Sequence, residues 1–344
     1  MTRGWLGAAA LGLSMTGAVM AEPTYMLLSF DDLADWAEDD HQAALTVFTE
    51  TCDDLSVPGW VGICAAAKVA PDARAFFEAF FQPVLVQDDE PMLFTGYFEP
   101  ELRGARERGG LYQYPIYRLP EDRVVGELYL TREQIEDGRP LAGRGLEIAW
   151  LADAVDLFFL QVQGSGRIRF EDGGGIRVGY GGKNGHTYTS VGRELVNRGI
   201  YDEHQVSAQV IRNWVRDNPD QGRELLWVNK SYVFFREVNE VPADKGPLGA
   251  MNRSITMGRS IAVDPDFTEL GTPVWVEKEG AAPMRRLMVA QDTGSAIKGA
   301  QRADIFYGTG DAAGRKAGRI KDGGRMIRLL PIQMAYALLP ETVE

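Results

Sequence analysis

Three aspartates in the C-terminal third of the chain have the setting that acid–base chemistry requires. Asp264, Asp292 and Asp304 all lie within residues 254–308. Asp304 stands in the run ADIFY, and apolar surroundings raise the pKa of a carboxyl group so that it can donate a proton near neutral pH. Asp292, twelve positions earlier, is the natural partner, since its charge would raise that pKa further. Asp264 precedes a proline and is predicted to occupy a turn or corner that affects folding rather than turnover.

The segment around Asp292 also has two competing interpretations. Residues 292–295 read DTGS, the motif of aspartic peptidases. Those enzymes need two carboxylates that share a proton, and the chain holds one copy, so a peptidase would have to be a homodimer. Alternatively, Asp292 only closes a turn with the threonine and glycine that follow it.

Several further segments carry the signature of a known family. They occur in a fixed order along the chain: 95–100 (TGYFEP), 114–117 (YPIY), 161–166 (QVQGSG), 181–186 (GGKNGH) and the three-aspartate segment 254–308. This combination resembles the membrane-bound lytic murein transglycosylase A family. The resemblance implies a mainly β fold, a barwin-like or expansin-like double-psi β-barrel with flanking helices and an inserted second β-rich domain. It also implies that Asp304 is the catalytic aspartate.

The chemistry implied by the resemblance needs only one acid/base. A lytic transglycosylase cleaves the β-1,4 bond between MurNAc and GlcNAc of peptidoglycan and forms 1,6-anhydro-MurNAc, because the C6 hydroxyl of the sugar replaces water. Asp304 would give the proton first and take one afterwards, and Asp292 would support it. A non-catalytic, expansin-like glycan-binding protein is the alternative from another class.

A glycan strand needs hydroxyl and amide partners and aromatic faces. Several polar and aromatic residues could supply these contacts, and the alternative is that they only pack in the barrel or shape turns. A basic cluster could attract acidic substituents of the glycan, or it could be a solvated surface; its members are Arg302, Arg315, Lys316 and Arg319. The predicted substrate-binding residues are Thr95, Tyr97, Gln161, Gln163, Ser165, Lys183 and Asn184.

Periodicity predicts the elements that would hold these residues. Apolar residues at helical intervals predict helices over 31–51, 72–81, 190–198, 203–216 and 331–339, with a short one starting at 131. Alternating segments from residue 92 onward predict strands, including one from 157 to 170 followed by a hairpin turn at 173–175. We expect a barrel domain from residues 22–103 and 230–344, and an inserted domain over 104–229 that forms the other wall of the glycan groove.

Composition limits the partners. The 344 residues carry a formal net charge of −13, which offers no general attraction to a phosphate backbone, so nucleic acid is not expected as a partner. His41, His186 and His204 are too scattered for a zinc pattern, and we expect no metal and no cofactor. The expected partner is the peptidoglycan glycan strand, bound by a monomer.

The first residues predict export. Residues 1–21 combine Arg3, an apolar run and small residues before Glu22, as in a signal peptide cleaved after Ala21. No cysteine follows the cleavage site to accept a lipid, so we expect a periplasmic protein without a lipid anchor. Its contact with the outer membrane would be peripheral.

The two cysteines, Cys52 and Cys64, are the only ones in the chain, and in an oxidising compartment they would form a disulfide. Two buried free thiols are the alternative.

Overall fold

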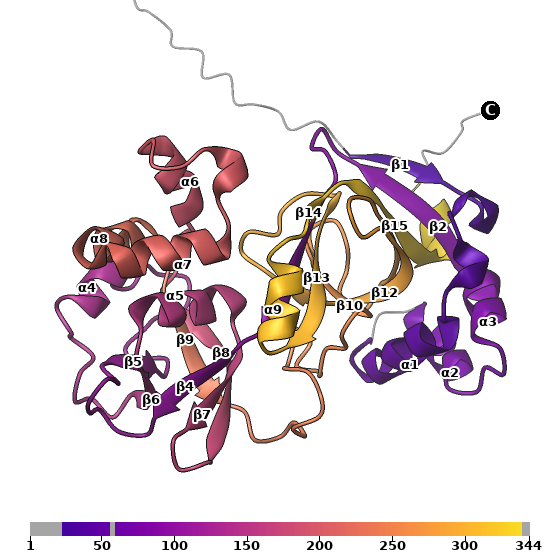
Figure 1. Ribbon diagram of the computed structural model, residues 1–344. Coiled ribbons are helices and arrows are strands. Elements are labelled where there is room, and N and C mark those ends of the chain that lie inside the picture. Colours follow the sequence, from indigo (N-terminus) through magenta and orange to yellow (C-terminus); the bar gives the residue numbers. More distant parts are fainter. Residues whose placement is uncertain (1–22, 56–58, 339–344) are drawn as a thin grey trace, which may run out of the picture.

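The computed structural model describes residues 23–55 and 59–338, and it is mainly β. Two sheets, of nine and six strands, form two lobes that lie side by side (Figure 1). The predicted signal peptide, residues 1–21, lies outside the described residues. Among the helices that the structure describes, none has the length and apolar character needed to cross a bilayer.

The first sheet curls into a nearly closed barrel. The last two strands, β14 (Lys321–Asp322) and β15 (Gly324–Pro331), are separated only by Gly323. Strand β15 pairs with β11 and β2, whereas β14 pairs with β3. The sheet order therefore returns on itself around a buried apolar core. The strands, in sheet order, are β1 (Thr24–Leu27), β2 (Phe81–Gln87), β15 (Gly324–Pro331), β11 (Pro273–Lys278), β12 (Met284–Thr293), β10 (Ser260–Val263), β13 (Arg302–Thr309), β3 (Leu93–Glu99) and β14 (Lys321–Asp322).

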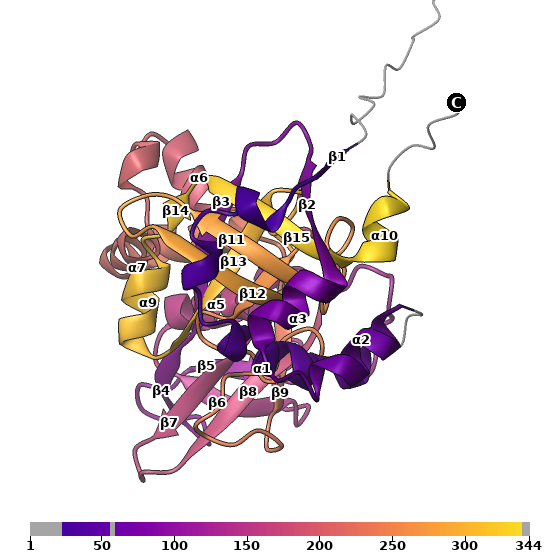
Figure 2. The same cartoon turned by 90° about the vertical axis from the view of Figure 1, so that its right-hand side faces the viewer.

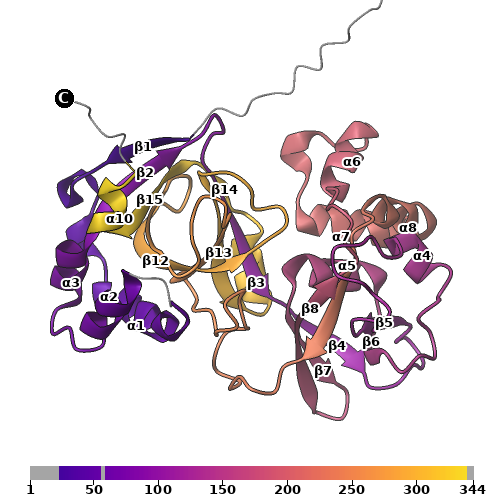
Figure 3. The ribbon, with the colours of Figure 1, turned by 180° about the vertical axis from the view of Figure 1, so that it is seen from behind.

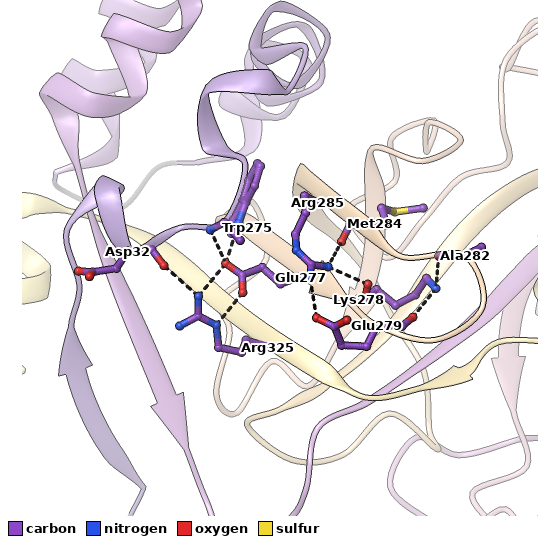
Figure 4. Close-up of polar contacts among 10 residues, drawn as sticks. Asp32, Trp275, Glu277, Lys278, Glu279, Ala282, Met284, Arg285 and Arg325 are labelled. Carbon is purple, nitrogen blue, oxygen red and sulfur yellow. Dashed lines mark hydrogen bonds and ion pairs between the residues drawn. The ribbon is translucent and has the colours of Figure 1, made fainter.

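Ion pairs of buried side chains join strands of the barrel. Glu277 on β11 is buried, accepts hydrogen bonds from the Trp275 indole at 3.2 Å and forms an ion pair with Arg325 at 2.6 Å (Figure 4). The next residue, Lys278, is fully buried and its Nζ lies 2.7 Å from Asp322 on β14. A buried charge is unfavourable unless it is paired, and both of these buried charges have partners on other strands of the barrel.

Three N-terminal helices cover one side of the barrel (Figure 2). They are α1 (His41–Thr51), α2 (Trp60–Ala67) and α3 (Ala73–Phe80), and they share an aromatic core with the barrel. The prediction of a helix over 72–81 is confirmed, but that over 31–51 is wrong at its start. The side chain of Asp40 accepts the Ala43 N–H, so the helix begins at residue 41, after two short 3₁₀ turns.

The structure joins α1 to α2 covalently. Cys52 and Cys64 form a disulfide with their Cα atoms 5.5 Å apart. Both side chains are buried in the helical layer.

The second sheet carries its helices on one side, as seen from behind in Figure 3. It begins at residue 101 and ends at 237, so it extends beyond the predicted limits of 104 and 229, because nothing in the composition marks the point where the chain leaves the barrel. The strands, in sheet order, are β5 (Tyr114–Tyr117), β6 (Glu147–Leu151), β4 (Glu101–Ala105), β7 (Gly166–Phe170), β8 (Gly175–Lys183) and β9 (Val233–Glu237). The helices are α4 (Arg132–Glu136), α5 (Ala154–Gln163), α6 (Val191–Asn197), α7 (Ala208–Asp217) and α8 (Pro219–Val228).

The predicted strand over 157–170 is wrong in its first half. Residues 154–163 form α5, which begins where the Asp153 side chain accepts the Val155 N–H and ends at Gly164, with φ of 78°. The helix is apolar around much of its surface because it is packed against both the sheet and the other helices. Such a continuous apolar run does not distinguish a buried helix from a buried strand.

Other helix limits differ in smaller ways. The helix predicted over 203–216 starts at 208, since Ser207 caps it, and 191–197 is helical as predicted. The C-terminal α10 (Ile332–Tyr336) lies within the predicted range, whose last residue is outside the described residues. The prediction of a hairpin turn at 173–175 is confirmed between β7 and β8.

Glu99 links the lobes at the point where β3 leaves the barrel. Its fully buried carboxylate pairs with Arg167 at 2.9 Å and Arg177 at 2.7 Å, both from the second sheet, and accepts the hydroxyl of Thr309 on β13 at 2.8 Å. The barrel and the second sheet therefore meet around one shared carboxylate.

Candidate active site

A pocket of about 190 Å³ lies where the two lobes meet. The barrel contributes Tyr97, Asp292 and Asp304, and the second lobe contributes Arg132, Gln161 and Gln163. Two of the three predicted aspartates thus face the same space as two of the predicted glutamines. The helix predicted wrongly as a strand, α5, is the element that brings both glutamines there.

Strand register places the two carboxylates on one face of the barrel. Thr95 on β3 pairs with Asp304 on β13, which pairs with Ala262 on β10, which in turn pairs with Asp292 on β12. Neighbouring strands lie about 4.8 Å apart, so the two aspartate positions are roughly 10 Å apart across the small Ala262 side chain.

A β-bulge sets the position of Asp292. The register between β10 and β12 shifts after Ile261, which pairs with Ala290, so that Gln291 is the extra residue. Gln291 points into the interior, where its amide donates to the Thr51 hydroxyl at 3.0 Å. Without the bulge, Gln291 would stand opposite Ala262 in place of the aspartate.

Asp304 keeps one oxygen free. Its Oδ1 accepts a hydrogen bond from the Thr95 hydroxyl at 2.8 Å, and the same Thr95 oxygen accepts one from Arg302 Nη2 at 2.9 Å. A hydroxyl has a single hydrogen, and since Arg302 can only donate, that hydrogen must go to Asp304. Within the described residues, Oδ2 of Asp304 has no hydrogen-bond partner. A proton held by Asp304 would therefore be on Oδ2, the oxygen that the pocket leaves available.

Asp292 is held differently, because all of its partners are donors. Its Oδ1 accepts the backbone N–H groups of Ala250 at 3.0 Å and Thr293 at 2.9 Å. Its Oδ2 accepts the Tyr97 hydroxyl at 3.0 Å. Three donors orient this carboxyl group and favour its charged form.

Burial raises the pKa of both aspartates to about 6. For Asp304 the charge of Asp292 raises the pKa further, while Thr95 and Arg302 oppose the shift. For Asp292 the three donors oppose burial. The pKa of Tyr97 is raised well above its usual value by burial and by Asp292, so its hydroxyl stays a donor.

The second lobe adds polar groups to the pocket. Gln163 Oε1 accepts the Phe98 N–H at 3.0 Å, whereas neither polar atom of the buried Gln161 side chain has a hydrogen-bond partner among the described residues. Arg132, in the first turn of α4, donates to the carbonyls of Asn229 and Ser231.

Four predicted substrate-binding residues do not line this pocket. Thr95 instead holds Asp304. Ser165 is buried beyond the end of α5 and does not line it. Lys183 is exposed at the end of β8. Asn184 is fully buried, and its amide donates to the carbonyls of Leu130 and Lys230 at 2.9 and 2.8 Å, so it holds loops together.

Asp264 and most of the predicted basic cluster also lie outside the pocket. Asp264 is buried beneath a turn, where it accepts from Lys298 Nζ at 2.9 Å and the Gly299 N–H at 3.0 Å. Arg315 and Lys316 are exposed on helix α9 (Asp311–Ala317) and Arg319 follows it, in keeping with a solvated face. Arg302 is the exception, since it lines the pocket.

Sequence reasoning named Arg302 only as one of a basic cluster, without its bond to Thr95, and it missed Arg132. Arg302 is two positions before Asp304, and alternate residues of a strand share a face, so the period of a strand could have indicated it. Arg132 has no comparable signal, because its position depends on carbonyls about 100 residues away. Within the described ranges, no three His, Cys, Asp or Glu side chains gather as a metal site would require.

Comparison with known proteins extends over both lobes. The family model described as the MltA specific insert domain matches residues 93–236, and the 3D domain model matches residues 259–330. Membrane-bound lytic murein transglycosylase A of Vibrio cholerae is 34% identical over 264 residues, 73% of this chain and 69% of that protein. The Escherichia coli K12 protein of the same name is 38% identical over 68% of this chain and 64% of its own length.

Solved structures agree. A membrane-bound lytic murein transglycosylase from Agrobacterium tumefaciens is 32% identical, with a TM-score of 0.82 over 91% of this chain and 99% of that one. E. coli MltA with bound chitohexaose is 29% identical, with a TM-score of 0.72 over 89% and 94%. From the Vibrio relative and the two matched models, the chain belongs to the membrane-bound lytic murein transglycosylase A family.

Proposed function

We propose that this protein is a lytic transglycosylase that cleaves the β-1,4 bond between MurNAc and GlcNAc of peptidoglycan, with Asp304 as acid and then base. The observation that carries the proposal is the free Oδ2 of Asp304. The other carboxyl oxygen, Oδ1, accepts the Thr95 hydroxyl, and the pKa of the carboxyl group is raised to about 6. About a tenth of such a group is protonated at pH 7, enough for a general acid.

Bond cleavage starts with that proton. Asp304 Oδ2 gives it to the glycosidic oxygen as the bond from C1 breaks, and the leaving sugar keeps the electron pair and the proton. Positive charge develops on the remaining sugar ring. Asp304 and Asp292 then both carry negative charge near that ring, which stabilises it.

Ring closure returns the proton. The C6 hydroxyl of the same sugar attacks C1 and loses its hydrogen to Asp304 Oδ2, which regenerates the acid and leaves a 1,6-anhydro ring. No water is consumed, so a second carboxylate to activate water is not needed. Thr95 keeps Oδ1 occupied throughout, so that one oxygen both gives and takes the proton.

The glycan strand lies between the lobes in this proposal. Gln161 and Arg132 line the second-lobe side of the pocket, and the related E. coli protein was solved with bound chitohexaose. The barrel has the double-psi topology, supported by its two parallel pairs, β3 with β13 and β10 with β12. The protein acts as a periplasmic monomer after export, and any contact with the outer membrane is peripheral.

Mass spectrometry of the products released from purified sacculi tests this function. We expect 1,6-anhydromuropeptides from the wild type, and a rate lower by about 10²–10⁴ in Asp304→Asn with glycan binding retained. Asp292→Asn keeps measurable activity with a shifted pH profile, and the exposed Asp266→Asn is the matched control.

Other products would overturn the proposal. Reducing MurNAc ends would indicate hydrolysis, cut stem peptides a peptidase, and binding without products an expansin-like protein. Normal turnover by a folded Asp304→Asn protein would move the acid/base role to Asp292.

A further inference from the structure

A row of hydrogen bonds connects Asp304 to a guanidinium group in the barrel wall. Arg302, the first residue of β13, donates from Nη2 to the Thr95 hydroxyl at 2.9 Å, and that hydroxyl donates to Asp304 Oδ1 at 2.8 Å. Arg302 and Asp304 both line the active-site pocket, whereas Thr95 does not. The arginine therefore reaches the carboxyl group through a side chain outside the pocket lining.

Two backbone carbonyls fix the orientation of the guanidinium group. Its Nη1 donates to the carbonyl of Ala303 at 2.7 Å and to that of Leu93 at 3.2 Å. The register that places Arg302 opposite Leu93 also places Asp304 opposite Thr95, on the parallel strands β13 and β3. Because Nη1 is occupied by these carbonyls and the guanidinium group is planar, Nη2 stays directed at Thr95.

This guanidinium group has no other acid beside it. In the described part of the chain its hydrogen-bond partners are the two carbonyls and the Thr95 hydroxyl, and it forms no ion pair. Burial lowers the pKa of Arg302, and the charge of Asp304 opposes that shift. Asp304 is therefore the acid on which this positive charge acts.

The arginine favours one oxygen of Asp304 as the site of the proton. An arginine only donates, so Thr95 accepts from Arg302 and directs its single hydrogen to Oδ1. A proton on Oδ1 would make the hydroxyl accept from both sides, and its own hydrogen would lose that acceptor. Without Arg302, the hydroxyl is free to accept from a protonated Oδ1, and the two protonated forms of Asp304 become closer in energy.

We propose that Arg302 is a positioning residue for the reaction, and that it acts on Asp304 through the hydroxyl of Thr95. It keeps the proton on Oδ2 before cleavage, and it keeps the same oxygen free to receive the proton of the C6 hydroxyl afterwards. Its charge also stabilises the carboxylate that exists between the two transfers. The role in turnover rests on the proposed function, whereas the effect on the ionisation of Asp304 does not.

Other titratable groups face Asp304 as well. The charge of Asp292 on β12 raises the pKa of Asp304, while Thr95 and Arg302 lower it. The charge of Asp304 in turn raises the pKa of Tyr97 on β3 and of Tyr307 on β13, so both hydroxyls stay protonated near neutral pH. Removal of Arg302 leaves burial and Asp292 less opposed, and the pKa of Asp304 should therefore rise.

Carbon-13 NMR titration of the Asp304 carboxyl group in the full chain measures this effect without turnover. The resonance is assigned as the one missing from Asp304→Asn. In Arg302→Met the pKa of Asp304 should rise by about 0.5 or more, and in Arg302→Lys, which keeps a positive charge that only donates, it should rise less. Arg315→Met removes an exposed guanidinium group outside the pocket and should leave this pKa unchanged. Circular dichroism verifies that each variant is folded.

A double-mutant cycle tests the route through Thr95. The substrate is a soluble, peptide-free MurNAc–GlcNAc tetrasaccharide, and rates are measured at a pH below the alkaline limb. Arg302→Met alone should lower kcat by about 10-fold with KM unchanged, and Arg302→Lys should restore part of kcat. In the Thr95→Val background, Arg302→Met should change kcat by about 2-fold at most, since the hydroxyl through which it acts is gone.

Three results would overturn the inference. They are an unchanged pKa of Asp304 in Arg302→Met, a loss of kcat as large in the Thr95→Val background as in the wild type, and a rise in KM with kcat unchanged, which would make Arg302 a substrate-binding residue. A wild type that releases no 1,6-anhydro product overturns the proposed function instead, and the NMR titration then still decides whether Arg302 acts on Asp304.

Discussion

Replacing Asp304 with asparagine should stabilise the fold while it stops the reaction. Asparagine has the shape of aspartate and its Oδ1 can still accept the Thr95 hydroxyl, so packing is unchanged. What changes is the charge that burial opposes. The pKa of Asp304 rises from 3.8 to about 6 on folding, a shift of roughly 2 units, or about 3 kcal/mol of penalty on the ionised form.

The sign of the effect depends on pH. Below about pH 4 the carboxyl group is neutral in both the folded and unfolded chain, so wild type and variant should have equal free energies of unfolding. Between about pH 4 and 6 the folded protein retains a proton that the unfolded chain has lost, and wild-type stability therefore falls as pH rises. Above about pH 7 the variant should be more stable by about 3 kcal/mol, since asparagine never ionises.

Urea unfolding at pH 4 and pH 8, followed by tryptophan fluorescence, measures the difference. The exposed Asp266→Asn should show none at either pH. If Asp304→Asn has the same stability as wild type at pH 8, or the same excess at both pH values, the raised pKa is wrong and so is the reason given for its acidity.

Three further predictions concern single contacts. Thr95→Val removes a bond that lowers the pKa of Asp304, so the alkaline limb that loss of this proton sets in the pH–rate profile should move to higher pH, and kcat should fall because Oδ1 and Oδ2 are no longer distinguished. Glu99→Gln leaves two arginines without their buried counter-charge and should lower the free energy of unfolding by about 3–5 kcal/mol, which a urea titration would detect. The double change Cys52→Ser and Cys64→Ser opens a loop of 12 residues and should cost about 2–4 kcal/mol in the same titration, with kcat on sacculi unchanged.

The residue types in the sequence indicated the chemistry of the site, but its geometry could not be predicted from them. Asp304 could be proposed as the acid because its apolar neighbours lie beside it in the chain. Its hydrogen-bond partner Thr95 is 209 residues away, and only strand pairing in the folded barrel brings the two together. Asp292 faces the pocket because of a bulge, which no periodicity shows.

The failures have physical causes of the same kind. Residues 154–163 are surrounded by apolar contacts, so their sequence pattern does not distinguish a helix from a strand. Gln161 and Gln163 nevertheless line the pocket, as predicted from their residue types. Asn184 has the residue type of a glycan ligand, but its bonds to distant carbonyls remove it from solvent. Burial by distant segments is a property of the fold that residue type does not reveal.

The distances in sequence within the site determine when it can exist. The partners of Asp304 and Asp292 on β3 precede them by 209 and 195 residues, and the barrel ring closes only when β14 and β15, near the end of the chain, have paired. A partly synthesised or truncated chain that stops before residue 304 has neither the proposed acid nor a finished barrel. An enzyme able to cut the polymer that supports the cell would thus remain inert until its last strands fold, and the topology alone would provide that delay.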